Sequence, residues 1–221
     1  MMNARNSFDQ ELRLLHLDLI KMGSMAEEAI EQSIHALLHR DNPLAESIVR
    51  GDNQVDDMEK QIEARCLALI IKEQPVAGDL RKVSSALKMV TDLERIGDNA
   101  ADIAEISLLI EGNHIENIIR HIPQMAQASV KMVHESIDAF VRSETTLAKR
   151  VIESDNVVDE LFCKVKDELK DAIKQGKDAG DNAADFLMIA KYLERIADHA
   201  VNICEWVLFA ETGIHKDKKI M

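Results

Sequence analysis

The sequence predicts an all-α fold made of two tandem antiparallel three-helix bundles, related by internal duplication. Apolar residues recur at helical spacing along nearly the whole chain of 221 residues. The composition is 46% hydrophobic but only 3% aromatic, which suits aliphatic helix packing better than pleated sheets. Only three Pro and eight Gly interrupt the pattern. We therefore expect six long helices with few breaks.

Three helices are expected in the first half of the chain. The first spans about 6–40 and ends before Pro43, which cannot continue a helix but fits the first turn of the next one. The second spans about 43–72 and stops at a Glu-Gln-Pro sequence. The third spans about 79–111, and Gly112 is placed to cap its end.

The second half repeats this pattern. Its helices are expected at about 115–142, 144–175 and 181–211, and the terminal residues 215–221 are expected to fray. The same division assigns 1–112 to a first repeat and 113–221 to a second.

The duplication is visible as matching motifs in the same order. The segment 92–98 (DLERIGD) returns as 192–198 (YLERIAD), shifted by 100 positions. The segments 52–56 (DNQVD) and 33–37 (SIHAL) return as 155–159 (DNVVD) and 136–140 (SIDAF), each shifted by 103. Three ordered matches indicate that each half is one helical unit, which buries its apolar stripe as a three-helix bundle.

The charge and the chain termini limit the classes of partner. The formal net charge of −13 argues against nucleic acid and against an anionic membrane as the main partner. The N-terminal sequence has no apolar signal region, and no apolar run reaches the ~20 residues that span a bilayer. We expect a cytoplasmic protein whose scattered Cys66, Cys163 and Cys204 are reduced.

Two acidic stripes mark the second and third predicted helices. On the third helix, Glu94, Asp98, Asp102 and Glu105 share one face, and on the second Asp52, Asp56, Glu59 and Glu63 do the same. Like charges at this spacing repel by roughly 0.2–0.5 kcal/mol per pair. A solvated acidic face is the simplest explanation, but basic neighbours or a bound cation would also offset the repulsion.

The recurrence of the stripes favours a metal site. Carboxylate oxygens on facing helices suit cations such as Mg, Ca, Mn, Fe or Zn. The candidate ligands are Asp52, Asp56, Glu94, Asp98, Asp102, Asp155, Asp159, Glu194 and Asp198. The halves differ, because Asn202 replaces Asp102 while Phe162 and Lys166 replace Glu59 and Glu63. We expect the first cluster to bind a cation more strongly than the second.

The sequence gives little support for an enzyme. A ferritin-like di-iron protein needs Glu-x-x-His on facing helices, and the one such spacing, Glu111 to His114, straddles Gly112 at a helix end. The sequence contains no P-loop, GxGxxG or GxSxG motif. A metal-binding or purely structural helical scaffold remains an alternative.

The motifs together resemble those of the PhoU family. The matching runs are 52–63 (DNQVDDMEKQIE), 74–81 (QPVAGDLR) and 92–98 (DLERIGD), and the resemblance covers nearly the whole chain. It implies two three-helix bundles related by a pseudo-twofold axis. It also implies that the family's (E/D)xxxD motifs correspond to Asp52/Asp56 with Glu94/Asp98, and to Asp155/Asp159 with Glu194/Asp198. In some members these motifs bind metal clusters.

The resemblance further implies a regulatory function. PhoU proteins are cytoplasmic, non-enzymatic and often dimeric. They repress the phosphate-starvation response, acting between the ATPase subunit of the phosphate-specific ABC transporter and a sensor histidine kinase. On this interpretation the chain would be a homodimer that reaches the membrane only through its partners. The alternative is a metal-binding helical scaffold without a phosphate role.

Overall fold

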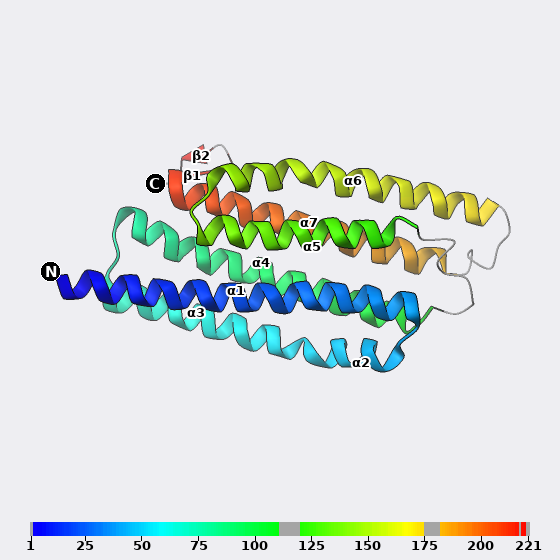
Figure 1. Cartoon of the computed structure of the whole chain (residues 1–221), viewed down its shortest axis with the longest axis horizontal. Helices are drawn as coiled ribbons and strands as arrows, with labels where there is room; N and C mark the ends of the chain where they lie inside the picture. The colour runs from blue at the N-terminus through cyan, green and yellow to red at the C-terminus, as the bar shows by residue number, and fades with distance from the viewer. Residues whose placement is uncertain (1, 111–119, 175–181, 217, 220–221) are drawn as a thin grey trace.

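The computed structural model describes residues 2–110, 120–174, 182–216 and 218–219, and within these ranges it confirms the all-α prediction. The elements are α1 (Met2–His39), α2 (Asn42–Gly51), α3 (Asn53–Glu73), α4 (Ala77–Ser107), α5 (Ile122–Val141), α6 (Thr145–Lys174), α7 (Ala183–Thr212), β1 (Ile214–His215) and β2 (Lys218–Lys219). The first bundle contains α1, α2, α3 and α4, and the second contains α5, α6 and α7 (Figure 1).

The expected second helix is divided in two, which corrects the continuous helix predicted over 43–72. Asp41 caps α2 by accepting a hydrogen bond from the Leu44 amide at 3.1 Å, and Pro43 lies in the first turn. The helix is then interrupted at Asp52, which lies between α2 and α3. Gly51 and Asp52 both have low helix propensity, which explains a break at this point.

Other helix ends differ from the predicted ones by a few residues. Helix α4 begins at Ala77, two residues before the predicted start, and ends at Ser107. The expected start of the fourth helix at residue 115 lies outside the described residues, while Arg120 and His121 form a turn and α5 begins at Ile122. Pro123 fits this position because its fixed φ and missing N–H suit the first turn of a helix. Gly112, Gln175 and Asp181 also lie outside the described residues.

Residues 214–215 and 218–219 pair as a short hairpin, so the fraying expected from residue 215 onward is wrong for the described part of this segment; residues 217, 220 and 221 lie outside the described residues. β1 pairs with β2 in antiparallel register. The His215 ring stacks on Trp206 of α7 with 3.9 Å between the ring centroids. The Lys216 ammonium lies 2.9 Å from Glu205 Oε2. These contacts hold the segment against the end of α7.

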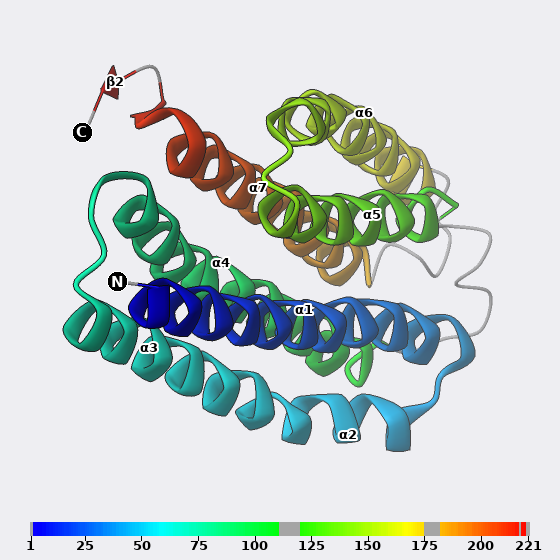
Figure 2. The same cartoon turned by 60° about the vertical axis from the view of Figure 1, so that its left-hand side comes forward.

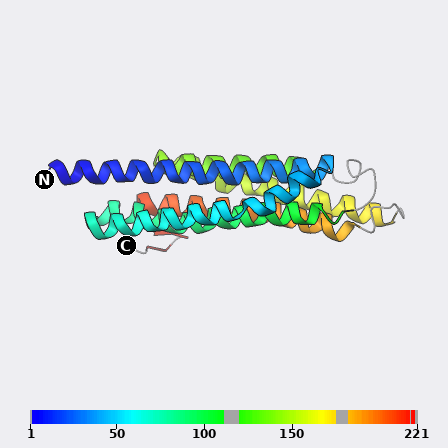
Figure 3. The same ribbon diagram turned by 90° about the horizontal axis from the view of Figure 1, so that it is seen from below.

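The two bundles lie side by side and pack through α4 and α7, which run antiparallel at the centre of the molecule (Figure 2). Helix α1 also contacts α5, where Gly23 allows close approach because a Cβ at this position would overlap Ile137. The molecule is elongated along the helix axes, and the start of α1 lies at the same end as the last turn of α7 (Figure 3).

One hydrophobic core runs through both halves. Leu15 of α1, Leu93 of α4, and Phe186 and Leu193 of α7 are nearly or fully buried in the same cluster. Ser129 of α5 donates a hydrogen bond to the Leu193 carbonyl at 3.1 Å, so this buried hydroxyl has a partner. No helix in the described ranges is both long enough and apolar enough to cross a membrane.

Candidate metal centre

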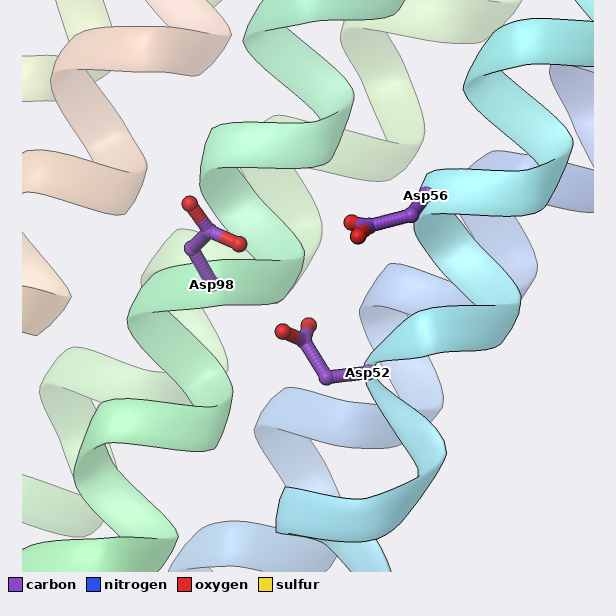
Figure 4. A group of neighbouring side chains, drawn as sticks. All are labelled: Asp52, Asp56 and Asp98. Atoms are coloured by element: carbon purple, nitrogen blue, oxygen red, sulfur yellow. The ribbon is translucent and has the colours of Figure 1, made fainter.

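Three aspartates of the first half converge between α3 and α4. Asp52 precedes α3, Asp56 lies in its first turn and Asp98 projects from α4 (Figure 4). One carboxylate oxygen from each residue lies within 4.8 Å of the other two. All three side chains are partly exposed, so a cation can reach them from solvent.

A glycine allows the two helices to approach at this point. A Cβ built at Gly97 would lie 3.0 Å from Val55 Cγ1, which is closer than ordinary van der Waals contact. Gly97 precedes Asp98, and Val55 precedes Asp56. Gly97 therefore lets α3 and α4 approach each other next to Asp56 and Asp98.

The electrostatics of the trio are unfavourable without a counter-ion. The pKa of Asp52 is raised to about 6, first by burial and then by the carboxylates of Asp98, Asp56 and Asp102. Burial also raises the pKa of Asp98, with Asp56 and Asp102 adding to the rise while Arg95 opposes it. The ionised trio thus concentrates negative charge that a cation would neutralise.

Glu94 lies at the same helix interface but has a basic neighbour. Arg95 Nε is 3.4 Å from Glu94 Oε2, and its Nη1 is 3.8 Å from Asp98 Oδ2. The pKa of Glu94 is raised mainly by burial and also by Asp98. Arg95 therefore offsets part of the acidic charge at the edge of the site.

Asp102 contacts α7 and is not one of the three converging aspartates. The Tyr192 hydroxyl hydrogen-bonds to its carboxylate. The duplicated position shows the related contact, in which Asn202 Nδ2 donates to Asp92 Oδ1 at 3.3 Å. His199 Nδ1 also lies 2.9 Å from that oxygen. The sequence did not predict these pairs, although Asp92 and Tyr192 occupy matching positions in the repeat.

The four predicted residues of the second half also gather. The pKa of Asp155 is raised to about 6 by burial and then by Asp159, Asp198 and Glu194. Burial and the Glu194 carboxylate raise the pKa of Asp198. Among the residues that the structure describes, however, only the first-half trio places three ligand atoms within 4.8 Å of one another.

The second half carries its own cations. Lys191 forms an ion pair with Glu194. Lys166 and Lys191 also lie over the Phe162 ring, at 5.0 and 5.8 Å from its centroid. The first half has Thr91 where the second has Lys191, and Thr91 hydrogen-bonds to Glu59. The role of Lys191 was not predicted from the sequence, although this residue directly precedes the repeated motif 192–198.

The residues at the matching helix positions also differ between the halves. Ala197 stands at the position of Gly97, and Val158 at that of Val55. Both Ala197 and Val158 are fully buried. The second half thus carries a buried methyl group at the position where the first half has glycine. The donor set of the first half, all carboxylate oxygen and partly desolvated, fits a hard divalent cation.

Because the pKa of Asp52 is raised in the folded protein, the free energy of unfolding should depend on pH. Between about pH 4 and 6 the folded chain holds a proton on Asp52 that the unfolded chain has released, so this residue's contribution to stability falls as the pH rises. The side chain makes no capping hydrogen bond to α3, so Asp52→Asn removes charge without removing a cap. In metal-free buffer at pH 7.5, Asp52→Asn should stabilise the protein by about 1 kcal/mol, allowing for solvent screening.

Urea unfolding at pH 7.5 and pH 4.5 measures this effect. The gain should disappear at pH 4.5, where Asp52 is protonated. Asp57→Asn is the matched control, because Asp57 is on the same helix and its side chain is 72% exposed. A loss of stability in Asp52→Asn at both pH values would contradict the account.

Comparisons with known proteins bear on both halves. The PhoU domain model matches residues 19–107 and 122–207. The chain is 38% identical over 215 residues to the phosphate-specific transport system accessory protein PhoU homolog of Clostridium acetobutylicum, covering 97% of this chain and 98% of that protein. It is 35% identical over 210 residues to the Pseudomonas aeruginosa homolog, covering 93% and 86% of the two chains.

Solved structures show the same fold. The crystal structure of the phosphate transport system regulatory protein PhoU from Streptococcus pneumoniae superposes with a TM-score of 0.87 at 28% identity, covering 97% of this chain and 99% of that one. PhoU from Pseudomonas aeruginosa superposes with a TM-score of 0.83 at 33% identity, covering 93% and 99%. Two matched domains, full-length relatives and a shared fold show that the chain belongs to the PhoU family.

Proposed function

We propose that this protein is a non-enzymatic regulator of phosphate uptake. It represses the phosphate-starvation response in the cytoplasm, together with the ATPase subunit of a phosphate ABC transporter and a sensor histidine kinase, and it acts as a homodimer. The observation that carries the proposal is similarity over the full chain to proteins named as accessory to phosphate-specific transport. The elongated, strongly acidic helical bundle supports a binding role, because it offers long helix faces to protein partners.

Deleting the gene tests the regulatory role. In phosphate-replete cells the deletion should raise alkaline phosphatase activity, since a repressor of the starvation response has been removed. Re-expression of the wild-type chain should restore low activity. Unchanged activity in the deletion strain would rule out repression and favour a helical scaffold without a phosphate role. Pull-down with the transporter ATPase and with the sensor kinase then tests each partner separately.

We further propose that the first half binds a divalent cation through Asp52, Asp56 and Asp98. The support is the convergence of three carboxylate oxygens and the raised pKa of Asp52 and Asp98. A hard cation such as Mg²⁺ or Mn²⁺ would neutralise the trio and fix α3 against α4. The second cluster would bind more weakly, because Lys191 already pairs with one of its carboxylates.

Metal analysis of gently purified protein tests this assignment. The wild-type chain should carry near-stoichiometric metal, and Asp56→Ala combined with Asp98→Ala should abolish it because two of the three ligands are lost. The matched control is Asp159→Ala combined with Asp198→Ala, which removes the equivalent residues of the second half and should retain most of the metal. Metal-free wild-type protein, or equal loss in both double variants, would contradict the assignment.

A further inference from the structure

Helix α2 packs on a small apolar cluster that is separate from the main core of the described residues. The members of this cluster are Ala45 and Ile48 of α2, Ala36 of α1 and Ala104 of α4, with Leu44, Val49 and Leu108 partly buried around them. Three of the four buried side chains are single methyl groups, which contribute little apolar surface. Helix α2 is therefore held less firmly than the longer helices, whose buried residues belong to the main core.

The duplicated segment of the second half is built into its bundle differently. The shift of 103 positions matches α2 with 145–154, which is the start of the continuous helix α6. Leu147, Ala148 and Val151 of this segment are buried in the main core. The matching segments are thus an integral part of a long helix in one half and a separate short helix in the other.

A cavity of about 290 Å³ lies beside the junction between α2 and α3. Its lining includes Ser47 and Gly51 of α2 together with Asp52. At three further lining positions the first half has a smaller side chain than the second: Ala29 against Met132, Gly97 against Ala197, and Ala101 against Val201. The end of α2 at the junction therefore borders empty space, which gives this helix room to move.

The junction has the features of a hinge. Gly51, the last residue of α2, has low helix propensity, and a Cβ built on it would meet no atom within 4 Å. Asp52 lies between the two helices, and its side chain makes no capping hydrogen bond to α3. Its carboxylate is one of the aspartate trio, in which it converges with Asp56 and Asp98. Because Asp52 links the two helices, a change in the angle of α2 shifts one carboxylate of the trio.

We propose that α2 is a hinged flap, which opens from α1 and α4 independently of the rest of the bundle and closes when a cation binds the aspartate trio. The coupling rests on the cation site proposed above. A cation that holds the Asp52 carboxylate against those of Asp56 and Asp98 fixes the junction and favours the docked position of α2. Without a cation, repulsion among the three carboxylates favours the open position. The apolar cluster beneath α2 is then covered or exposed according to cation binding.

Hydrogen–deuterium exchange of the full chain, followed by mass spectrometry, tests the flap. In metal-free buffer, and corrected for intrinsic rates, amides 46–51 should exchange about tenfold faster or more than the matching amides 149–154, because α2 opens locally. MnCl₂ at ten times its dissociation constant should slow exchange at 46–51 by about tenfold and leave 149–154 unchanged. Asp56→Ala combined with Asp98→Ala should abolish this effect of Mn²⁺, because two ligands are lost.

Gly51→Ala tests the hinge without a cation. The added methyl group meets open space and strengthens the helix across the junction, so metal-free exchange at 46–51 should slow by about fourfold while 149–154 stays unchanged. Equal slowing of both segments would show that α2 opens only with the whole molecule, and would overturn the flap.

Metal analysis of the same samples separates the coupling from the cation site. A chain that binds Mn²⁺ while exchange at 46–51 stays the same would overturn the coupling and leave the cation site standing. A chain that binds no Mn²⁺ would overturn both the cation site and the coupling, and the Gly51→Ala comparison would still decide whether α2 opens by itself.

Discussion

The antiparallel packing of α4 against α7 is the contact on which the rest of the molecule depends. At one end Arg81 donates a hydrogen bond to the Ala210 carbonyl at 3.1 Å, and Lys82 lies 3.5 Å from Glu211. Near the middle Asp92 and His199 form a pair whose side chains are only 15% and 19% exposed. This contact joins the two bundles into one core, and α4 and α7 each contribute carboxylates to one acidic cluster.

Duplication fixed the positions of the two clusters, but single substitutions separate their chemistry. In the first half Gly97 leaves room for Val55, and the second half has Ala197 at the matching position. Lys191 supplies a positive charge where the first half has the neutral Thr91. In the first half three carboxylates converge beside Arg95, while in the second half Lys191 forms an ion pair with Glu194.

Much of this arrangement could be predicted from the sequence, because helical periodicity and repeated motifs are local signals. Matching the motif 92–98 with 192–198 identified the duplication, and the four-residue spacing identified Asp52, Asp56 and Asp98. The break at Asp52 was missed because apolar periodicity continues across it, with Ile48 and Val55 both buried.

Contacts between segments far apart in the chain could not be predicted in the same way. The pairing of Asp92 with His199 and the docking of the C-terminal hairpin on Trp206 depend on how distant segments meet in space. The sequence placed both arms of the aspartate trio on helix faces, but only packing decides how closely those faces approach. Gly97 connects local sequence with tertiary packing. The sequence shows that this position has no side chain, and the structure shows that Val55 of α3 packs closely against it.

The central claim is that a divalent cation distinguishes the two halves, and anomalous scattering from crystals grown with Mn²⁺ tests it most directly. Both acidic clusters are present in every molecule, so each serves as an internal control for the other. The account predicts the stronger anomalous peak between Asp52, Asp56 and Asp98, with a weak peak or none beside Asp155 and Asp198. Equal peaks at the two clusters, or a peak at the second cluster alone, would contradict it.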